Sequence, residues 1–266
     1  MTLDPSWSRP REYPVLDGAI TTHSLEVHVT DHCNLRCAGC CVLSPLAARR
    51  FVAMDELARD LDWAKRVVRP SVFKLSGGEP LLAPHIVELA RIAKESHIAP
   101  RISMTTNGVL LSRAPDALFE HLDAITLSIY PAVGIDAADL DALRARAAHY
   151  DVVLNEKRQD VFQSMTRREP MRDAATVRAV FESCWLRHRC HTVRDGVFFA
   201  CSRPPGLGMP IDGISLLPRA GLAEDVSLHL QRSEPFASCT HCLGGSGARF
   251  PFRQLTLAEL RERRPE

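Results

Sequence analysis

The chain has 266 residues, of which 45% are hydrophobic, enough for one large core with a small appendage and too few for a fully separate second domain. Its 33 Lys and Arg residues nearly balance 32 Asp and Glu residues, so neither nucleic acid nor a membrane is an expected partner. No apolar run approaches the roughly 20 residues that span a bilayer, and the first residues do not resemble a signal peptide, so a cytoplasmic location is expected.

The apolar pattern alternates between strand and helix through the first two thirds of the chain. A short buried strand at residues 25–30 leads into a cysteine-rich loop, and helical and strand-like spacings then follow in turn. In chain order we expect a helix at 54–68, a strand at 71–76, a helix at 85–98, a strand at 101–106, a short helix at 115–122, a strand at 124–130, a helix at 136–150 and a strand at 151–155. This α/β order predicts a partial (β/α)6 TIM-like barrel over residues 1–180, with the loops after the strands facing one site.

The composition changes near residue 181, where Cys, Gly and Pro cluster and long helical periods end. Residues 181–266 are therefore expected to form a small cysteine-stapled module that closes with an exposed helix at 255–263. The chain holds nine cysteines, and a reducing compartment does not favour disulfides, so metal ligation or redox chemistry is the expected use of the thiols.

Three of these thiols fall within eight residues, in the loop after the first strand. Cys33, Cys37 and Cys40 supply three soft ligands, which suit an iron–sulfur cluster and leave one iron open. Their C-x3-C-x2-C spacing resembles the defining motif of the radical S-adenosylmethionine (SAM) superfamily, in which SAM chelates the fourth iron of a 4Fe-4S cluster. Gly39 departs from that motif, because an aromatic residue commonly precedes the last cysteine. A zinc site is the alternative interpretation.

Further segments between residues 25 and 160 resemble the same superfamily. Gly77-Gly78-Glu79-Pro80, after the second strand, is similar to its GGEP motif, in which glycines let the backbone approach a ligand closely and Glu79 would contact the SAM amino group. Thr106 and Asn107, at the end of the third strand, resemble its TNG segment. The resemblance implies that these residues bind SAM, together with Ser128 on the fourth strand, whose hydroxyl could instead bond only to backbone.

Five further cysteines follow in the C-terminal module: Cys184, Cys190, Cys201, Cys239 and Cys242. Their arrangement resembles the twitch and SPASM extensions of radical SAM enzymes, and the module's length implies one auxiliary 4Fe-4S cluster (twitch), hence two clusters in all. Asp195-Gly196 is a hairpin signal, and pairing outward from it places Cys190 opposite Cys201. We therefore expect Cys190, Cys201, Cys239 and Cys242 as ligands and Cys184 as the spare thiol. The competing assignment, from C-x11-G-x4-C spacing, makes Cys184 a ligand and Cys190 spare.

The resemblance implies that SAM cleavage produces a 5′-deoxyadenosyl radical that removes a hydrogen atom from the substrate. A spare thiol that returns a hydrogen atom to the opposite face would make the enzyme an epimerase. Without such a donor, loss of a proton and an electron would make it a dehydrogenase. Both outcomes occur among the aminoglycoside-biosynthesis enzymes that the chain resembles. An enzyme that modifies a peptide is a further alternative.

The leading prediction is an epimerase that inverts a carbinol carbon of an aminoglycoside or related carbohydrate, with Cys184 as hydrogen donor. An electron donor such as flavodoxin or ferredoxin is the expected protein partner. Glu156, just after the fifth strand, is predicted to bind a substrate ammonium or deprotonate a hydroxyl, unless it is simply solvated. His23, Glu26 and His28 are expected to line the barrel interior or to be satisfied polar groups of the core.

Overall fold

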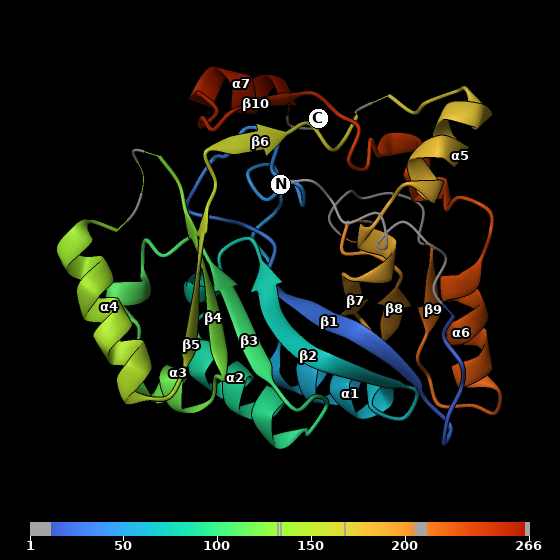
Figure 1. Cartoon of the computed structure of the whole chain (residues 1–266), viewed down its shortest axis with the longest axis horizontal. Helices are drawn as coiled ribbons and strands as arrows, with labels where there is room; N and C mark the ends of the chain where they lie inside the picture. The colour runs from blue at the N-terminus through green and yellow to red at the C-terminus, as the bar shows by residue number, and fades with distance from the viewer. Residues whose placement is uncertain are drawn as a thin grey trace.

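The computed structural model describes residues 12–131, 133, 135–167, 169–203, 205 and 212–263. The outer ends of the two expected domains, at residues 1–11 and 264–266, lie outside these ranges. An eight-stranded sheet runs through the described chain in the order β5-β4-β3-β2-β1-β7-β8-β9 (Figure 1). No helix in the described ranges is both long and apolar enough to cross a membrane.

Strands β1 to β5 are parallel neighbours. Their bounds are β1 Ile20–Thr30, β2 Val68–Gly77, β3 Ile102–Thr106, β4 Ala124–Ile129 and β5 Val153–Arg158. The connecting helices cover one face of the sheet (Figure 1), and are α1 Met54–Ala64, α2 Ile86–Glu95, α3 Asp116–Glu120 and α4 Ala137–His149. The predicted partial barrel with its C-terminal module is confirmed. The sixth parallel strand differs from the simplest expectation, because it comes from the C-terminal module as β7, which pairs with β1.

The C-terminal module extends the sheet beyond β1. Its elements are α5 Ala174–Glu182, β7 His191–Arg194, β8 Val197–Phe199, β9 Gly213–Ser215, α6 Leu222–Gln231 and α7 Leu257–Arg263, with short 3₁₀ turns at Leu186–His188 and Ala237–His241. The predicted hairpin is confirmed: Asp195 and Gly196 both have positive φ, and the ladder pairs Arg194 with Val197 and Thr192 with Phe199.

Strand β1 carries polar side chains on the face turned away from the helices. Residues alternate sides along a strand, so one face of β1 presents apolar Leu25, Val27 and Val29 to the helices. The opposite face, called the interior face below, presents five buried polar side chains: Thr22, Ser24, Glu26, His28 and Thr30. Parallel strands buried on both faces are normally apolar, and a polar interior face therefore marks where a polar ligand would lie. His23 falls on the helix-facing side by the same alternation.

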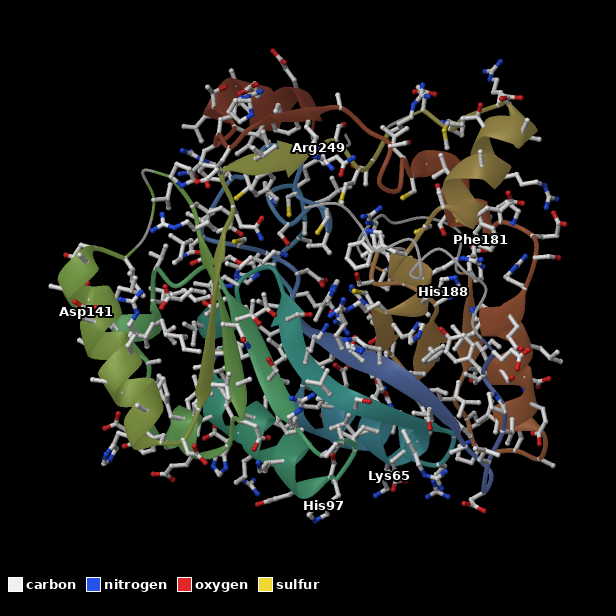
Figure 2. All side chains as sticks on the ribbon, in the orientation of Figure 1. Lys65, His97, Asp141, Phe181, His188 and Arg249 are labelled. Carbon is white, nitrogen blue, oxygen red and sulfur yellow. The ribbon has the colours of Figure 1, made fainter. Side chains whose placement is uncertain are left out.

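The C-terminal segment returns to the carboxyl ends of the parallel strands. Strand β10 (Arg249–Pro251) pairs with β6 (Val161–Gln163), and both lie at that end with α7 (Figure 1). Beyond β10 the chain bonds to the first cysteine loop, with Ala38 N donating to Arg253 O at 3.0 Å and Leu255 N to Arg36 O at 2.7 Å. Sulfur atoms gather mostly at the end where Arg249 lies, away from Lys65 and His97 (Figure 2).

Candidate active site

The first cysteine loop follows β1 and brings three thiols within electrostatic reach of one another. Burial raises the pKa of Cys37 to about 12, and the charges of Cys40 and Cys33 act in the same direction. The sulfur of Cys33 accepts hydrogen bonds from Leu35 N at 3.4 Å and Asn107 Nδ2 at 3.5 Å. Buried thiolates that repel one another are stable only when cations neutralise them, because a coordinating metal deprotonates its thiol ligands. The donor set therefore suits a metal cluster.

Two glycines let the end of β2 pack against the backbone of this loop. A Cβ on Gly77 would overlap Thr30 O, and one on Gly78 would overlap His32 O. Gly78 N donates to Thr30 O at 2.8 Å. The sequence predicted a close approach of these glycines to a ligand, whereas in the structure they approach the protein's own backbone. The two glycines thereby fix the loop that carries the thiols.

Glu79 is fully buried, and both of its carboxylate oxygens are occupied by protein donors. Oε1 accepts from Thr106 Oγ1 at 2.7 Å and from Leu81 N at 3.1 Å, and Oε2 accepts from Asn107 N at 2.8 Å. Burial raises the pKa of Glu79, and these three hydrogen bonds oppose the rise. In this structure Glu79 thus ties the end of β2 to the end of β3, and its expected contact with a SAM amino group stays a prediction.

Asn107 extends that tie to the thiols. Its side-chain nitrogen, Nδ2, donates to Cys33 Sγ and, at 2.7 Å, to Asn34 Oδ1. Its side-chain oxygen, Oδ1, accepts from Val109 N at 3.0 Å. The segments that resemble GGEP and TNG therefore form one hydrogen-bonded unit with the cysteine loop.

Tyr130, at the end of β4, faces the same loop and was missed by the sequence analysis. Burial raises the pKa of its phenol, and the charge of Cys37 acts in the same direction, while Ser128 forms a hydrogen bond to it. The ring stacks on Phe252, with centroids 4.9 Å apart and planes at 28°. Ser128 is buried on the interior face, as its predicted role requires, and its hydroxyl is engaged by Tyr130.

The departure of Gly39 from the usual motif has a physical explanation. Gly39 has a φ of 72°, and a Cβ there would lie 2.7 Å from the ring of Phe250. Phe250 comes from β10, far along the chain, and packs in a small cluster with Ala38 and Leu255. An aromatic ring thus covers the loop at this point, supplied by the C-terminal strand.

The C-terminal thiols divide differently from the favoured prediction. Burial raises the pKa of Cys201, and the charges of Cys184 and Cys239 add to the rise. Burial likewise raises the pKa of Cys239 to about 12, with Cys242 and Cys184 adding to it. Cys184, the expected spare thiol, therefore lies with the other three, as in the competing assignment. The ladder ends at His191 and Phe199, so the hairpin pairing does not continue to Cys190 and Cys201.

Cys190 instead lies beside β1 and β2. Burial raises the pKa of its thiol to about 12; among the neighbouring charges, Glu26 raises this pKa, Lys74 lowers it and Cys41 raises it further. Glu26 is buried on the interior face and accepts a hydrogen bond from Thr192 Oγ1 at 3.4 Å. Cys190 directly precedes β7, which pairs His191 with Leu25 and Thr192 with Glu26, so this thiol lies next to the strand that borders the interior face of β1.

Comparison with known families decides the class of this site. A family model described as the radical SAM superfamily matches residues 27–159, which is half of the chain and includes the whole hydrogen-bonded unit described above. The chain belongs to the radical SAM superfamily.

Curated relatives of this radical SAM chain include GTP 3′,8-cyclases. GTP 3′,8-cyclase 2 of Mycobacterium tuberculosis (strain ATCC 25618 / H37Rv) is 36% identical over 151 residues, covering 53% of this chain and 41% of the relative. GTP 3′,8-cyclase of Streptomyces coelicolor is 32% identical over 176 residues, covering 64% and 44%. The chain thus spans less than half the length of these relatives.

Solved structures with a similar arrangement include BtrN in complex with AdoMet and 2-DOIA, with a TM-score of 0.49, 13% identity and coverage of 85% of this chain and 94% of that one. Streptococcus suis SuiB bound to S-adenosylmethionine gives a TM-score of 0.44, 13% identity and coverage of 79% and 68%.

Among the described residues, no group of three or more His, Cys, Asp or Glu side chains is placed so that it could hold a metal ion. Membership of the radical SAM superfamily implies a 4Fe-4S cluster and SAM, with Cys33, Cys37 and Cys40 as the residues that fit it.

The structure does not support the predicted role of Glu156. Strand β5 continues to Arg158, and its register pairs Glu156 with Leu127, whose side chain is buried in the core under the helices. Glu156 accordingly points outward and accepts from Arg144 Nε at 2.6 Å and Nη2 at 2.8 Å, which lowers its pKa. The interior position belongs to its neighbour Lys157, which pairs in register with Ser128.

A bidentate ion pair joins the hairpin to the first cysteine loop. Arg194 donates to Asp31 at 3.0 Å and 2.9 Å, and the two side chains are only 19% and 13% exposed. We expect Arg194→Met to cost about 2–3 kcal/mol, because it leaves the Asp31 carboxylate partly buried without its partner. The Tm measured by calorimetry should fall by several degrees, whereas Arg144→Met, which breaks an exposed pair, should have a smaller effect. Equal losses would contradict this coupling.

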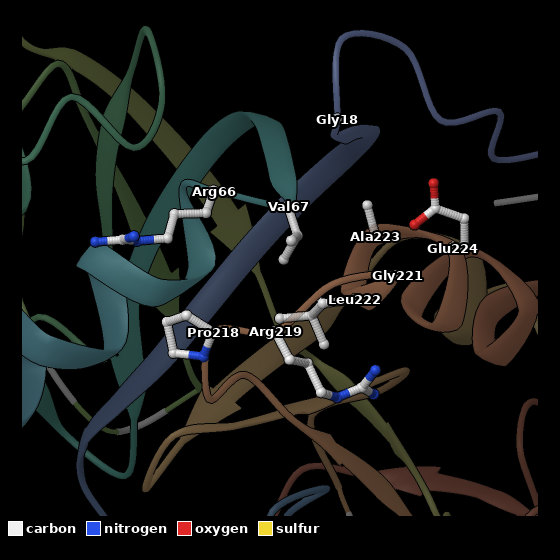
Figure 3. Close-up of a pocket in the computed structure, with 9 residues that line it drawn as sticks. All are labelled: Gly18, Arg66, Val67, Pro218, Arg219, Gly221, Leu222, Ala223 and Glu224. Atoms are coloured by element: carbon white, nitrogen blue, oxygen red, sulfur yellow. The ribbon is translucent and has the colours of Figure 1, made fainter.

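A surface pocket of about 340 Å³ lies at the opposite, amino end of β1 and β2 (Figure 3). Gly18, Val67 and Leu222 are among its lining residues. None of the candidate site residues lines it, so we assign it no part in the chemistry.

Proposed function

We propose that the protein is a radical SAM epimerase that inverts a carbinol carbon of an aminoglycoside or related carbohydrate, with Cys190 as the hydrogen donor. The observation that supports this most directly is the pairing of β7, which Cys190 directly precedes, with β1: Thr192 lies beside Glu26 and donates to its carboxylate on the interior face. This proposal transfers to Cys190 the role that the sequence had suggested for Cys184.

Two 4Fe-4S clusters would be held by separate thiol sets. Cys33, Cys37 and Cys40 would hold the first, with SAM bound near Gly77, Gly78, Thr106, Asn107 and Ser128. The second would be held by the four grouped thiols: Cys184, Cys201, Cys239 and Cys242. When bound, the first cluster and SAM supply a 5′-deoxyadenosyl radical that removes a hydrogen atom from a carbon.

Cys190 is suited to return a hydrogen atom rather than to act as a nucleophile. A pKa of about 12 keeps the thiol protonated at neutral pH. In the proposed step, the Cys190 S–H bond breaks and a C–H bond forms on the face opposite the one that lost its hydrogen. The sulfur radical that remains takes one electron and one proton, the electron from a flavodoxin- or ferredoxin-type donor. The substrate is then inverted with no net oxidation.

The interior face supports a substrate rich in hydroxyl and amino groups. The five polar side chains of β1 lie on it, and on the same side of the sheet Thr105 of β3 is paired in register with Thr126 of β4. Hydroxyl and carboxylate groups bind sugar hydroxyls by hydrogen bonds, and the buried carboxylate of Glu26 would complement an ammonium group.

Dehydrogenation is the second candidate, because four thiols grouped as an auxiliary cluster site could hold an electron acceptor. Turnover in deuterated water separates the two outcomes. We expect deuterium at one inverted carbon of an aminoglycoside, because a thiol exchanges its proton with solvent. Formation of a ketone without inversion would favour the dehydrogenase. The substrate panel should include GTP, in view of the name of the relatives, and turnover of GTP alone would contradict the proposal.

A further inference from the structure

A buried arginine lies among the grouped C-terminal thiols. Arg203 is only 4% exposed, and its guanidinium donates to Cys242 Sγ at 2.7 Å and to Met165 Sδ at 2.8 Å. Both sulfur atoms are weak acceptors when neutral. Among the described residues, its guanidinium donates to these two sulfur atoms and to no carboxylate, although a carboxylate is the usual partner of a buried arginine.

A buried guanidinium is stable only beside an anion, since removing its charge from water costs several kcal/mol. The group beside Arg203 that can become an anion is the thiol of Cys242, to which the guanidinium donates. Cys242 Sγ also accepts from Gly244 N at 3.3 Å, so two donors converge on this sulfur. Such a site is built for an anionic sulfur.

We propose that Arg203 is a positioning and tuning residue of the auxiliary cluster, which stabilises the thiolate of Cys242 and raises the reduction potential of the cluster. This inference rests on the proposed auxiliary cluster. Reduction adds one negative charge to a cluster, so a buried cation that donates to a ligating sulfur stabilises the reduced form more than the oxidised form. Net charge and hydrogen bonds to the sulfurs are the features that set such potentials.

The test uses the full chain with Cys33→Ala, Cys37→Ala and Cys40→Ala, so that only the auxiliary cluster remains. Redox titration followed by electron paramagnetic resonance then gives its midpoint potential. We expect Arg203→Met to shift the midpoint potential downward and Arg203→Lys to shift it less. Lysine keeps the positive charge but cannot donate to Cys242 and Met165 at once, as the guanidinium does. Arg178→Met is the matched control: Arg178 is an exposed arginine of α5 paired with Glu234, and its removal should leave the potential unchanged.

Each outcome decides a separate claim. An unchanged potential in a fully loaded Arg203→Met protein would overturn the inference and leave the proposed function intact. Loss of iron from Arg203→Met but not from Arg203→Lys would support a requirement for positive charge. Loss from both would show a packing role and overturn the electrostatic one. If the variant with Cys33, Cys37 and Cys40 all replaced by Ala binds no iron, the protein has no auxiliary cluster, and this inference is overturned with it.

Discussion

Cys190→Ala is expected to abolish epimer formation and divert the product to the ketone. Without the thiol, the substrate radical has no hydrogen donor on the opposite face, and loss of a proton and an electron becomes the remaining exit. We expect epimer formation to fall by about 100-fold or more, which corresponds to about 2.7 kcal/mol in the barrier. Mass spectrometry and NMR of products formed in deuterated water measure both the loss of label and the appearance of ketone.

Two cysteine variants are matched controls for this result. Cys184→Ala should retain the hydrogen donor but lose auxiliary iron, so that about four of about eight iron atoms remain. Cys41→Ala removes a neighbouring thiol that we assign to neither cluster, and the product should still carry deuterium. If the product of Cys190→Ala carries deuterium and the product of Cys41→Ala does not, Cys41 is the hydrogen donor. Iron loss from Cys190→Ala instead of Cys184→Ala would restore the hairpin assignment of the ligands.

The local patterns of the sequence were enough to predict the fold and part of the hairpin. The strand and helix alternation of the core was predicted, because each element buries one apolar face with its own period. The Asp195-Gly196 turn fixed the register as far as Thr192 and Phe199. It could not show that the ladder ends there, since that depends on how β7 pairs with β1. The ligand assignment drawn from the hairpin depended on a pairing beyond that point.

Contacts between distant segments were beyond the reach of sequence patterns. Phe250 reaches Gly39, and Arg203 reaches Met165 and Cys242, with no local spacing that marks either contact. The position of Glu156 differs from the expected one for another reason: β5 continues past the predicted end to Arg158, and alternation along the added residues turns Glu156 outward. A polar run after a strand does not reveal which of its members faces inward.

Glu79→Ala is expected to destabilise the protein more than any of the cysteine or arginine substitutions. It leaves three donors without an acceptor in a buried region: Thr106 Oγ1, Leu81 N and Asn107 N. Each unsatisfied donor costs about 1–3 kcal/mol, and partial relaxation brings the expected total to about 3–5 kcal/mol. This is a large fraction of the roughly 5–15 kcal/mol that stabilises a typical domain. Calorimetric Tm values measure the loss.

The same substitution should also lower the iron content of the first cluster, because Asn107 connects Glu79 to Cys33. Glu79→Gln keeps one carbonyl acceptor but turns an amide donor toward other donors, so we expect an intermediate loss of stability. Glu88→Ala, at a solvent-accessible position on α2, should change stability by no more than about 0.5 kcal/mol. A Glu79→Ala protein as stable as Glu88→Ala would mean that the buried carboxylate does not hold β2, β3 and the cysteine loop together.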